Sequence, residues 1–168
     1  LTLQWKDVDM KGKTFTIQAT VAKNHREHTL PMSDAILDVF KRRDAAREND
    51  YVFPGQGGIG HIVELKRAVQ AVTKKSKVKF CLHDLRRTFS GIAEQEVSYA
   101  ILKRLLNHYT GNDVTAGYLV IPTEQLRDPM QKITNRIMTA MLEPEEQEQQ
   151  EKEPEPQKQP KEKGKVLQ

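Results

Sequence analysis

The sequence has a single cysteine, Cys81, among 168 residues, so a framework of disulfide bonds is excluded. A reducing cytoplasm is the simplest compartment for such a chain, and we expect Cys81 to be a small buried apolar side chain. No apolar stretch approaches the roughly 18 residues that a membrane-spanning helix requires. These two shortages predict a soluble cytoplasmic protein.

The sequence also lacks an initiating methionine, and its opening LTLQWKDVDM is too polar for the apolar core of a signal peptide. We therefore expect a fragment that begins inside a domain. The length and the 37% of hydrophobic residues suit one domain. From Glu143 onward the chain is Glu, Gln, Lys and Pro with almost nothing to bury. The sequence predicts one domain over residues 1–142 and a disordered tail over 143–168.

Acidic charge is concentrated in that tail. The last 26 residues hold five of the 27 Lys and Arg and eight of the 23 Asp and Glu, which leaves 22 basic and 15 acidic residues, a net charge of +7, before Glu143. A basic surface attracts nucleic acid by neutralising phosphates, although many basic domains are only more soluble for it. Charge alone leaves nucleic-acid binding open.

Apolar periodicity predicts a mainly α-helical α+β fold with a small antiparallel β-hairpin. Alternating residues in 13–20 and a second apolar stretch at 27–33 predict its two strands. Helices are predicted at residues 34–48, 61–75, 83–95, 98–107, 115–120 and 123–142. Ser33 or Asp34 is expected to cap the first of them. The glycines of YVFPGQGGIG lack the Lys-Ser/Thr ending of a phosphate-binding loop and predict a connector.

The stretch LHDLRRTF holds a His and an Arg three residues apart. On a helix His83 and Arg86 share one face, while Leu85 and Phe89 are expected to point toward the core. An isolated pair of this kind is typical of an ordinary amphipathic helix with surface charges.

The residues that follow make the pair more informative. LLNH ends the next predicted helix with His108, and Thr115 and Tyr118 come seven and ten residues later. These blocks resemble the catalytic domain of tyrosine recombinases, the phage integrase family. The resemblance covers about residues 1–121. It includes LQWKDVD, similar to the end of the family's first motif, and a hairpin with Lys23 in its turn before LPMS.

The resemblance implies the tyrosine recombinase catalytic-domain fold and a role for five residues. Tyr118 would be the nucleophile, its ionisation favoured by nearby cations, and His83 would assist its proton transfer. Arg86 would hold the phosphate with its guanidinium fork, Lys23 would protonate the departing 5′ oxygen, and His108 would hydrogen-bond the phosphate. Because a 3′-phosphotyrosyl link keeps the bond energy, this chemistry implies no cofactor, ATP or metal.

The implied activity is integration or excision of a phage or genomic island at double-stranded DNA attachment sites. The implied partners are three further copies in a homotetramer on DNA and, in some systems, accessory DNA-bending proteins, all in the nucleoid. The family's first catalytic Arg would fall a few residues before Leu1, and the core-binding domain is also missing from this sequence. We therefore expect this fragment to bind DNA weakly and to cleave poorly.

Other interpretations remain open. A type IB topoisomerase shares the fold and the tyrosine, and an inactive DNA-binding module of the same fold is a further alternative. Tyr99 and Tyr109 are expected to pack or cap, and His61 to begin a helix. The pair His25 and His28 suggests a metal site, but no acidic cluster or second cysteine accompanies it.

The last predicted helix carries an apolar stripe at helical spacing, formed by Met130, Ile133, Ile137, Met138 and Met141. One interpretation is that it packs on its own domain. The resemblance suggests another: residues 124–142 dock on a neighbouring subunit in the assembled complex and fold back or stay mobile in the free monomer.

Overall fold

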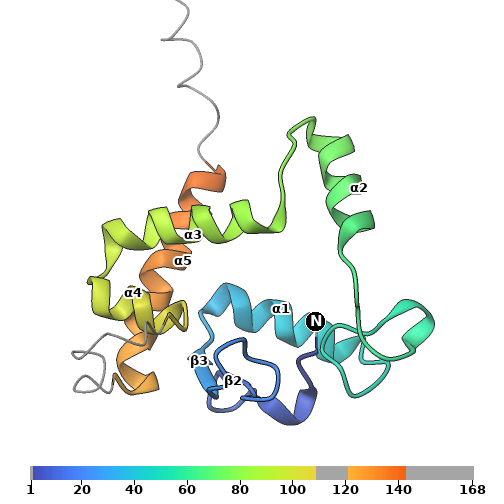
Figure 1. The fold of residues 1–168 in the computed structure, drawn as a ribbon, viewed down its shortest axis with the longest axis horizontal. Helices are drawn as coiled ribbons and strands as arrows, with labels where there is room; N and C mark the ends of the chain where they lie inside the picture. The colour runs from blue at the N-terminus through green and yellow to red at the C-terminus, as the bar shows by residue number, and fades with distance from the viewer. Residues whose placement is uncertain (1, 109–120, 143–168) are drawn as a thin grey trace, which may run out of the picture.

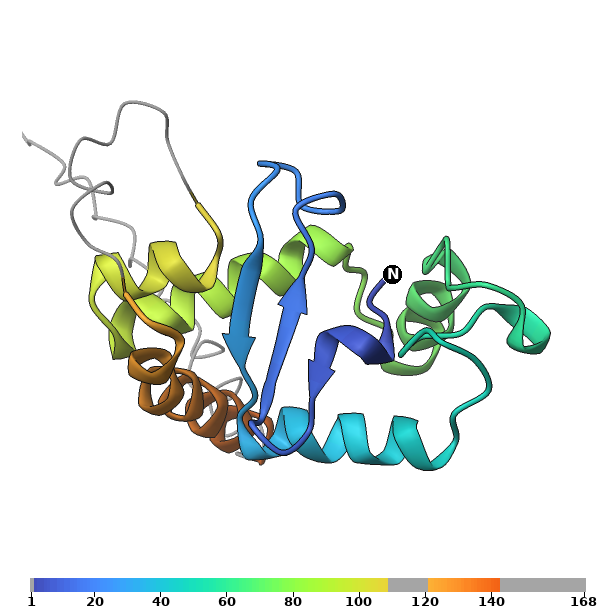
Figure 2. The same ribbon diagram turned by 90° about the horizontal axis from the view of Figure 1, so that it is seen from below.

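The computed structural model describes residues 2–108 and 121–142. Three short strands form an antiparallel sheet in chain order: β1 (Val8–Asp9), β2 (Thr14–Ile17) and β3 (His28–Pro31). Phe15 pairs with Leu30 across β2 and β3. The predicted hairpin is confirmed, and its loop over residues 18–27 projects beyond the ends of β2 and β3 (Figure 2).

Five helices and three short 3₁₀ turns account for most of the remaining described residues. The helices are α1 (Asp34–Ala45), α2 (Lys66–Ser76), α3 (Leu82–Glu96), α4 (Tyr99–Leu105) and α5 (Arg127–Leu142), and the turns are η1 (Trp5–Asp7), η2 (Gln56–Gly58) and η4 (Thr123–Leu126). The result is the predicted α+β class. The helix predicted at 115–120 and the tail at 143–168 lie outside the described residues. In the part of the chain that is described, no helix is long and apolar enough to cross a bilayer.

One apolar core lies between the sheet and the helices α3, α4 and α5. Leu126 and Ile133 are completely buried in it, together with Ala93 of α3 and Leu102 of α4. Figure 1 shows α5 crossing α3 on the side of the molecule that carries α4. The first half of the predicted stripe on α5 therefore packs on its own domain.

A second apolar core lies between α1, the start of the chain and residue 52. Phe40 of α1 meets Trp5 edge-on at 6.4 Å between ring centroids and Phe15 of β2 at 5.6 Å. Phe15 contacts both cores. The sheet thus joins the two halves of the fold.

Helix α5 is tied to the rest of the fold by polar contacts as well. The Arg127 guanidinium donates to the Gly12 carbonyl in the turn between β1 and β2 at 2.9 Å. The Asp34 backbone N–H, at the start of α1, donates to the Gln131 side chain at 3.0 Å. Ser33 occupies the predicted N-cap position of α1, but its buried hydroxyl makes no hydrogen bond there.

Residues 59–81, which include α2, form an arm that stands apart from both cores (Figure 1). No residue of α2 is buried, and Val63 and Val72 are 87% and 52% exposed. The prediction that His61 begins a helix is wrong, because His61 forms a β-bridge with Pro54 and α2 begins at Lys66.

Two burial predictions at the start of α3 are also wrong. Cys81 is exposed and Leu85 is 55% exposed, whereas Phe89 one turn later packs against the first core as predicted. Helical periodicity correctly gives the face on which Leu85 lies. The first half of α3, however, contains no buried residue, so that face is exposed there.

Candidate active site

The last turn of α4 fixes the position of His108. Asn107 adopts a left-handed conformation with φ of 54°. The His108 N–H donates to the Lys103 carbonyl at 3.0 Å and the Asn107 N–H to the Arg104 carbonyl at 3.3 Å. This pair of bonds closes the helix in a Schellman motif, which Asn tolerates better than most residues. The Asn of LLNH therefore ends the helix, and His108 follows with an exposed side chain.

The loop that carries Lys23 is bound to this helix end. The Asn24 side-chain amide donates to the Asn107 side-chain oxygen at 3.0 Å and to the Asn107 carbonyl at 3.2 Å. The Asn107 amide donates in return to the Asn24 side chain at 3.3 Å. Ala22 is buried and Lys23 is exposed. Lys23 therefore projects into solvent from a loop anchored on both sides of it.

Arg86 reaches the same helix end from α3. Its Nη2 donates to the Leu106 carbonyl, one of the carbonyls that end α4, at 2.9 Å. His83 lies one turn earlier on α3 and is exposed like Arg86. Basic side chains are favoured near the carbonyl end of a helix. The last turn of α4 therefore helps to hold Arg86 in place.

Asp84 secures the first turn of α3. Its carboxylate accepts the Cys81 backbone N–H at 2.8 Å, and Arg87 lies 3.8 Å away. The bond from Cys81 is the main cause that lowers the pKa of Asp84 below its ordinary value, and Arg87 acts in the same direction. Asp84 is therefore a carboxylate at neutral pH and stabilises the helix start beside His83.

Three predicted site residues thus lie on segments that are joined at the end of α4. His108 follows it in the chain, Arg86 bonds to it, and Lys23 adjoins Asn24, which bonds to it. His83 belongs to the same helix as Arg86. Tyr118 and Thr115 lie outside the described residues. Figure 2 shows the β2–β3 loop and the end of α4 on the same edge of the molecule.

A polar pair formed by the buried His28 and the partly buried Arg104 lies beside the end of α4, and the sequence did not reveal it. His28, the first residue of β3, is 2% exposed. Its Nε2 donates to the Leu105 carbonyl at 3.3 Å, and its Nδ1 accepts from Nη1 of Arg104 at 2.6 Å. Burial and the Arg104 charge lower the pKa of His28, although its bond to Leu105 opposes them. The neutral imidazole therefore serves as donor and acceptor together.

The suggested metal pair of His25 and His28 is not assembled. His25 is exposed in the loop, whereas both ring nitrogens of His28 are engaged. Within residues 2–108 and 121–142, no three His, Cys, Asp or Glu side chains come together in a way that could hold a metal ion.

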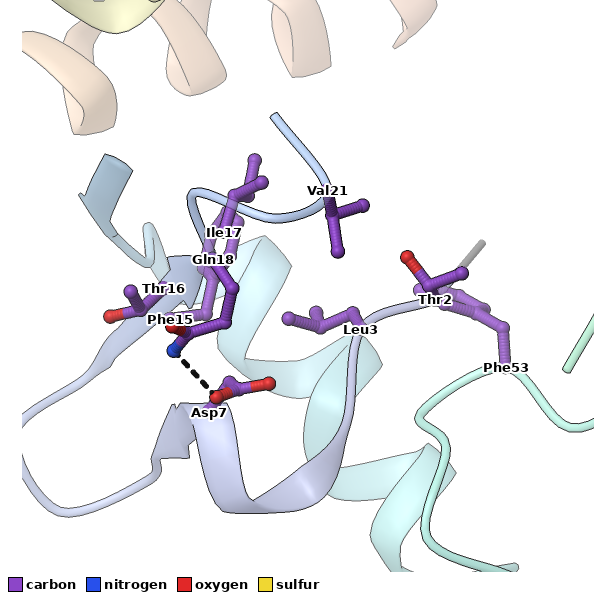
Figure 3. A pocket seen from close by; sticks show the side chains of 9 residues that line it. All are labelled: Thr2, Leu3, Asp7, Phe15, Thr16, Ile17, Gln18, Val21 and Phe53. Atoms are coloured by element: carbon purple, nitrogen blue, oxygen red, sulfur yellow. Dashed lines mark hydrogen bonds between the residues drawn. The ribbon is translucent and has the colours of Figure 1, made fainter. Parts of the chain in front are cut away.

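A groove of about 390 Å³ lies between β2 and the start of the chain (Figure 3). Leu3, Ile17, Val21 and Phe53 give it an apolar lining, and Gln18 donates to Asp7 at 2.8 Å across one side. Among the described residues, no cationic side chain lines it. A phosphodiester requires charged donors, so this groove does not suit the chemistry that the end of α4 suits.

Comparison with known proteins finds similarity to one protein family and to two curated proteins. Residues 1–121 match the model of the Phage integrase family. The integrase of Shigella phage Sf6 is 32% identical over 122 residues, which are 70% of this chain and 31% of that protein. Prophage integrase IntA of Escherichia coli strain K12 is 27% identical over 135 residues, which are 77% of this chain and 32% of that protein.

The fold is also similar to a crystal structure of XerA recombinase. The TM-score is 0.56 at 18% sequence identity, over 85% of this chain and 51% of that one. The chain spans about a third of the length of the curated relatives that it matches.

Proposed function

Because this chain belongs to the phage integrase family, we propose that it supplies the catalytic domain, over residues 1–142, of a site-specific DNA recombinase. The observation that supports the proposal is that the segments carrying Lys23, Arg86 and His108 are joined at the end of α4. These residues come from three different segments of the chain. Arg86 itself bonds the Leu106 carbonyl at 2.9 Å, whereas Lys23 and His108 are held through their neighbours Asn24 and Asn107, which bond each other at 3.0 and 3.3 Å. Exposed side-chain donors on joined segments, among them the Lys23 ammonium and the Arg86 guanidinium, suit an anion such as a DNA phosphate.

The proposed step is attack of the Tyr118 phenolate oxygen on a DNA phosphorus. A bond forms from that oxygen to phosphorus, the bond from phosphorus to the 5′ oxygen breaks, and Lys23 protonates the departing oxygen. Arg86 and His108 stabilise the negative charge that grows on the non-bridging oxygens, and His83 assists removal of the phenol proton. Attack by a 5′ hydroxyl on the phosphotyrosyl link reverses the step and joins a new strand.

Trapping of the covalent intermediate tests the function. The full-length protein is incubated with a nicked duplex that carries its attachment site, so that the cleaved strand diffuses away and the phosphotyrosyl link accumulates. We expect a covalent complex with the wild type and with Tyr99→Phe, since Tyr99 is 74% exposed on α4 and has no proposed role. Tyr118→Phe should abolish it.

Two other outcomes have defined meanings. A wild type that binds the duplex and never forms the covalent complex is a binding module, and the proposal is then wrong. Covalent trapping with relaxation of supercoils, but without exchange between two sites, identifies a topoisomerase.

Double-stranded DNA is the proposed partner, in the nucleoid, and salt dependence tests it. Before Glu143 the chain carries a net charge of +7, because it contains 22 Lys and Arg and 15 Asp and Glu. Each phosphate that the protein neutralises releases condensed counterions, so the binding constant should fall steeply with salt. A constant that is flat between 50 and 200 mM salt would exclude the basic surface as the DNA face.

The proposed active form is a homotetramer, with contacts through the end of α5. Met130 and Ile133 at its start are buried, but Met138, Met141 and Leu142 at its end are 43%, 73% and 78% exposed. Since the start of α5 belongs to the core, only its end is free to reach a neighbour. Replacing the three exposed residues with serine should preserve cleavage by a bound subunit and abolish recombination between two sites. Undiminished recombination would contradict this contact.

A further inference from the structure

Arg104 of α4 joins segments that are otherwise far apart in the chain. Its Nη1 donates to His28 at 2.6 Å, its Nη2 to the Thr29 carbonyl at 3.3 Å, and its Nε to the Ile121 carbonyl at 3.3 Å. His28 and Thr29 begin β3, directly after the loop that carries Lys23. Ile121 follows Tyr118 by three positions in the sequence.

His28 holds this guanidinium in place. It is buried under the end of α4 and bonds the Leu105 carbonyl with its other ring nitrogen. A guanidinium presents its donors in a fixed planar fork, so its two acceptors in β3 and its one acceptor at Ile121 fix the position of those two segments relative to α4. The lowered pKa of His28 keeps its Nδ1 lone pair available to Arg104 at neutral pH.

Residues 106–108, directly after Arg104 and Leu105, make the hydrogen bonds that hold the other segments of the candidate site. Asn107 bonds the Lys23 loop, Leu106 accepts from Arg86, and His108 follows. Arg104 lies in the last turn of α4, four residues before His108, and it bonds the base of the Lys23 loop through His28 and Thr29. A movement of the guanidinium would therefore shift Lys23 and His108 relative to Arg86.

We propose that Arg104, seated on His28, is a positioning residue for DNA cleavage: it sets the placement of Lys23 and His108 against Arg86 without touching DNA. This inference rests on the proposed recombinase function. Misplacement of a reacting group by about 1 Å can reduce a rate by about 10²-fold, so a link of this kind has a measurable effect.

The test compares variants of the full-length protein that retain or remove the link. Arg104→Met keeps an apolar stem and removes every donor, whereas Arg104→Lys keeps the charge and at most part of the fork. His28→Leu removes both the donor to the Leu105 carbonyl and the acceptor for Arg104, whereas the side-chain amide of His28→Gln still offers a donor and an acceptor. Arg42→Met, an exposed arginine on α1, is the matched control.

Each variant is assayed for single-turnover cleavage at saturating DNA, for DNA affinity, and for the melting temperature. We expect Arg104→Met and His28→Leu to cleave about 10- to 100-fold more slowly than the wild type with affinity changed less than about threefold. His28→Gln should restore most of the rate, Arg104→Lys should fall between, and Arg42→Met should match the wild type.

A second measurement, hydrogen exchange of this chain without DNA, does not depend on catalysis. Faster exchange is expected over residues 18–27 in Arg104→Met and not in Arg42→Met. If the variants melt earlier but cleave at the wild-type rate, the link is only structural and the proposal is wrong. If the wild type itself never cleaves while exchange responds as expected, the proposed function fails and the link between Arg104 and the loop stands.

Discussion

The end of α4 and the arm of residues 59–81 are built in opposite ways. At the end of α4, hydrogen bonds from the Lys23 loop, from α3 and from β3 converge on residues 104–107. The arm carries apolar side chains too, yet no residue of α2 is buried, and Val63 and Val78 are 87% and 63% exposed. Amphipathic sequence alone does not decide which segment is integrated into the fold.

Helix α3 connects these two regions and shares the properties of both. Its second half packs on α5, with Ala93 fully buried, whereas Leu82 and Leu85 in its first half are half-exposed. Arg86 lies at the boundary, held by the Leu106 carbonyl. The candidate site therefore combines Lys23 and His108, whose backbone segments are anchored by the body, with His83, which is positioned mainly by its own helix.

The largest expected effect comes from the residue at that boundary. Arg86→Ala in the full-length protein should slow single-turnover cleavage by about 10²-fold or more and leave DNA affinity nearly unchanged, because a preorganised donor acts mainly on the transition state. Arg86→Lys should restore part of the rate. An unchanged cleavage rate in Arg86→Ala would remove Arg86 from the site.

The contrast in packing predicts the next effect. Ile133→Ala should lower the free energy of unfolding by about 2–5 kcal/mol, because its fully buried side chain leaves a cavity between α3 and α5. Val72→Ala on α2, 52% exposed, should change it by less than about 0.5 kcal/mol. Urea unfolding followed by circular dichroism would measure both changes in the free energy of unfolding. Equal losses would mean that the arm is as firmly packed as the core.

Two substitutions of Asn107 distinguish how its left-handed backbone conformation and its side-chain hydrogen bonds each contribute to stability. Asn107→Ala should lower the free energy of unfolding by about 1–2 kcal/mol, because alanine is strained at φ of 54° and loses the bonds to Asn24. Asn107→Gly relieves the strain and loses only the bonds, so it should be less destabilising. If glycine is the more harmful of the two, the left-handed conformation contributes little.

The smallest expected effect is the pH dependence contributed by His28. Since its pKa in the folded state is lowered from 6.5, the unfolded state binds the proton more readily as the pH falls. Stability from this group is complete above about pH 6.5 and decreases below it, by at most about 1.4 kcal/mol per pH unit. Urea unfolding of the wild type between pH 5 and 8, compared with His28→Gln, measures it. Identical pH profiles would contradict the buried neutral imidazole.

Much of this fold could be predicted because hairpins and amphipathic helices leave local patterns. The hairpin, α1, α3 and α4 lie within a few residues of their predicted ranges. Local patterns give the apolar face of a helix but not the element that covers it, so Leu85 was predicted to be buried. Helix α2 begins five residues later than predicted, because His61 pairs with Pro54 instead.

The candidate site residues were predicted from the resemblance of short motifs to those of a known family. Lys23, His83, Arg86 and His108 belong to short motifs, and the structure brings three of them to one helix end. The roles of these residues, and the nucleophile Tyr118, stay predictions. His28 was considered only beside its sequence neighbour His25, whereas its partner Arg104 is 76 residues away. No local pattern reveals such a pair.

The contact between Arg127 and Gly12 bears on how the chain folds during synthesis. These residues are 115 positions apart, and Leu126 and Ile133 beside Arg127 complete the core that contains Leu30 of β3. The ribosome therefore releases the hairpin long before the helix that covers it exists. Contacts of such long range slow folding, and an uncovered sheet face is prone to aggregation meanwhile. We expect a nascent chain stalled near residue 121 to recruit chaperones, and one that includes α5 to escape them.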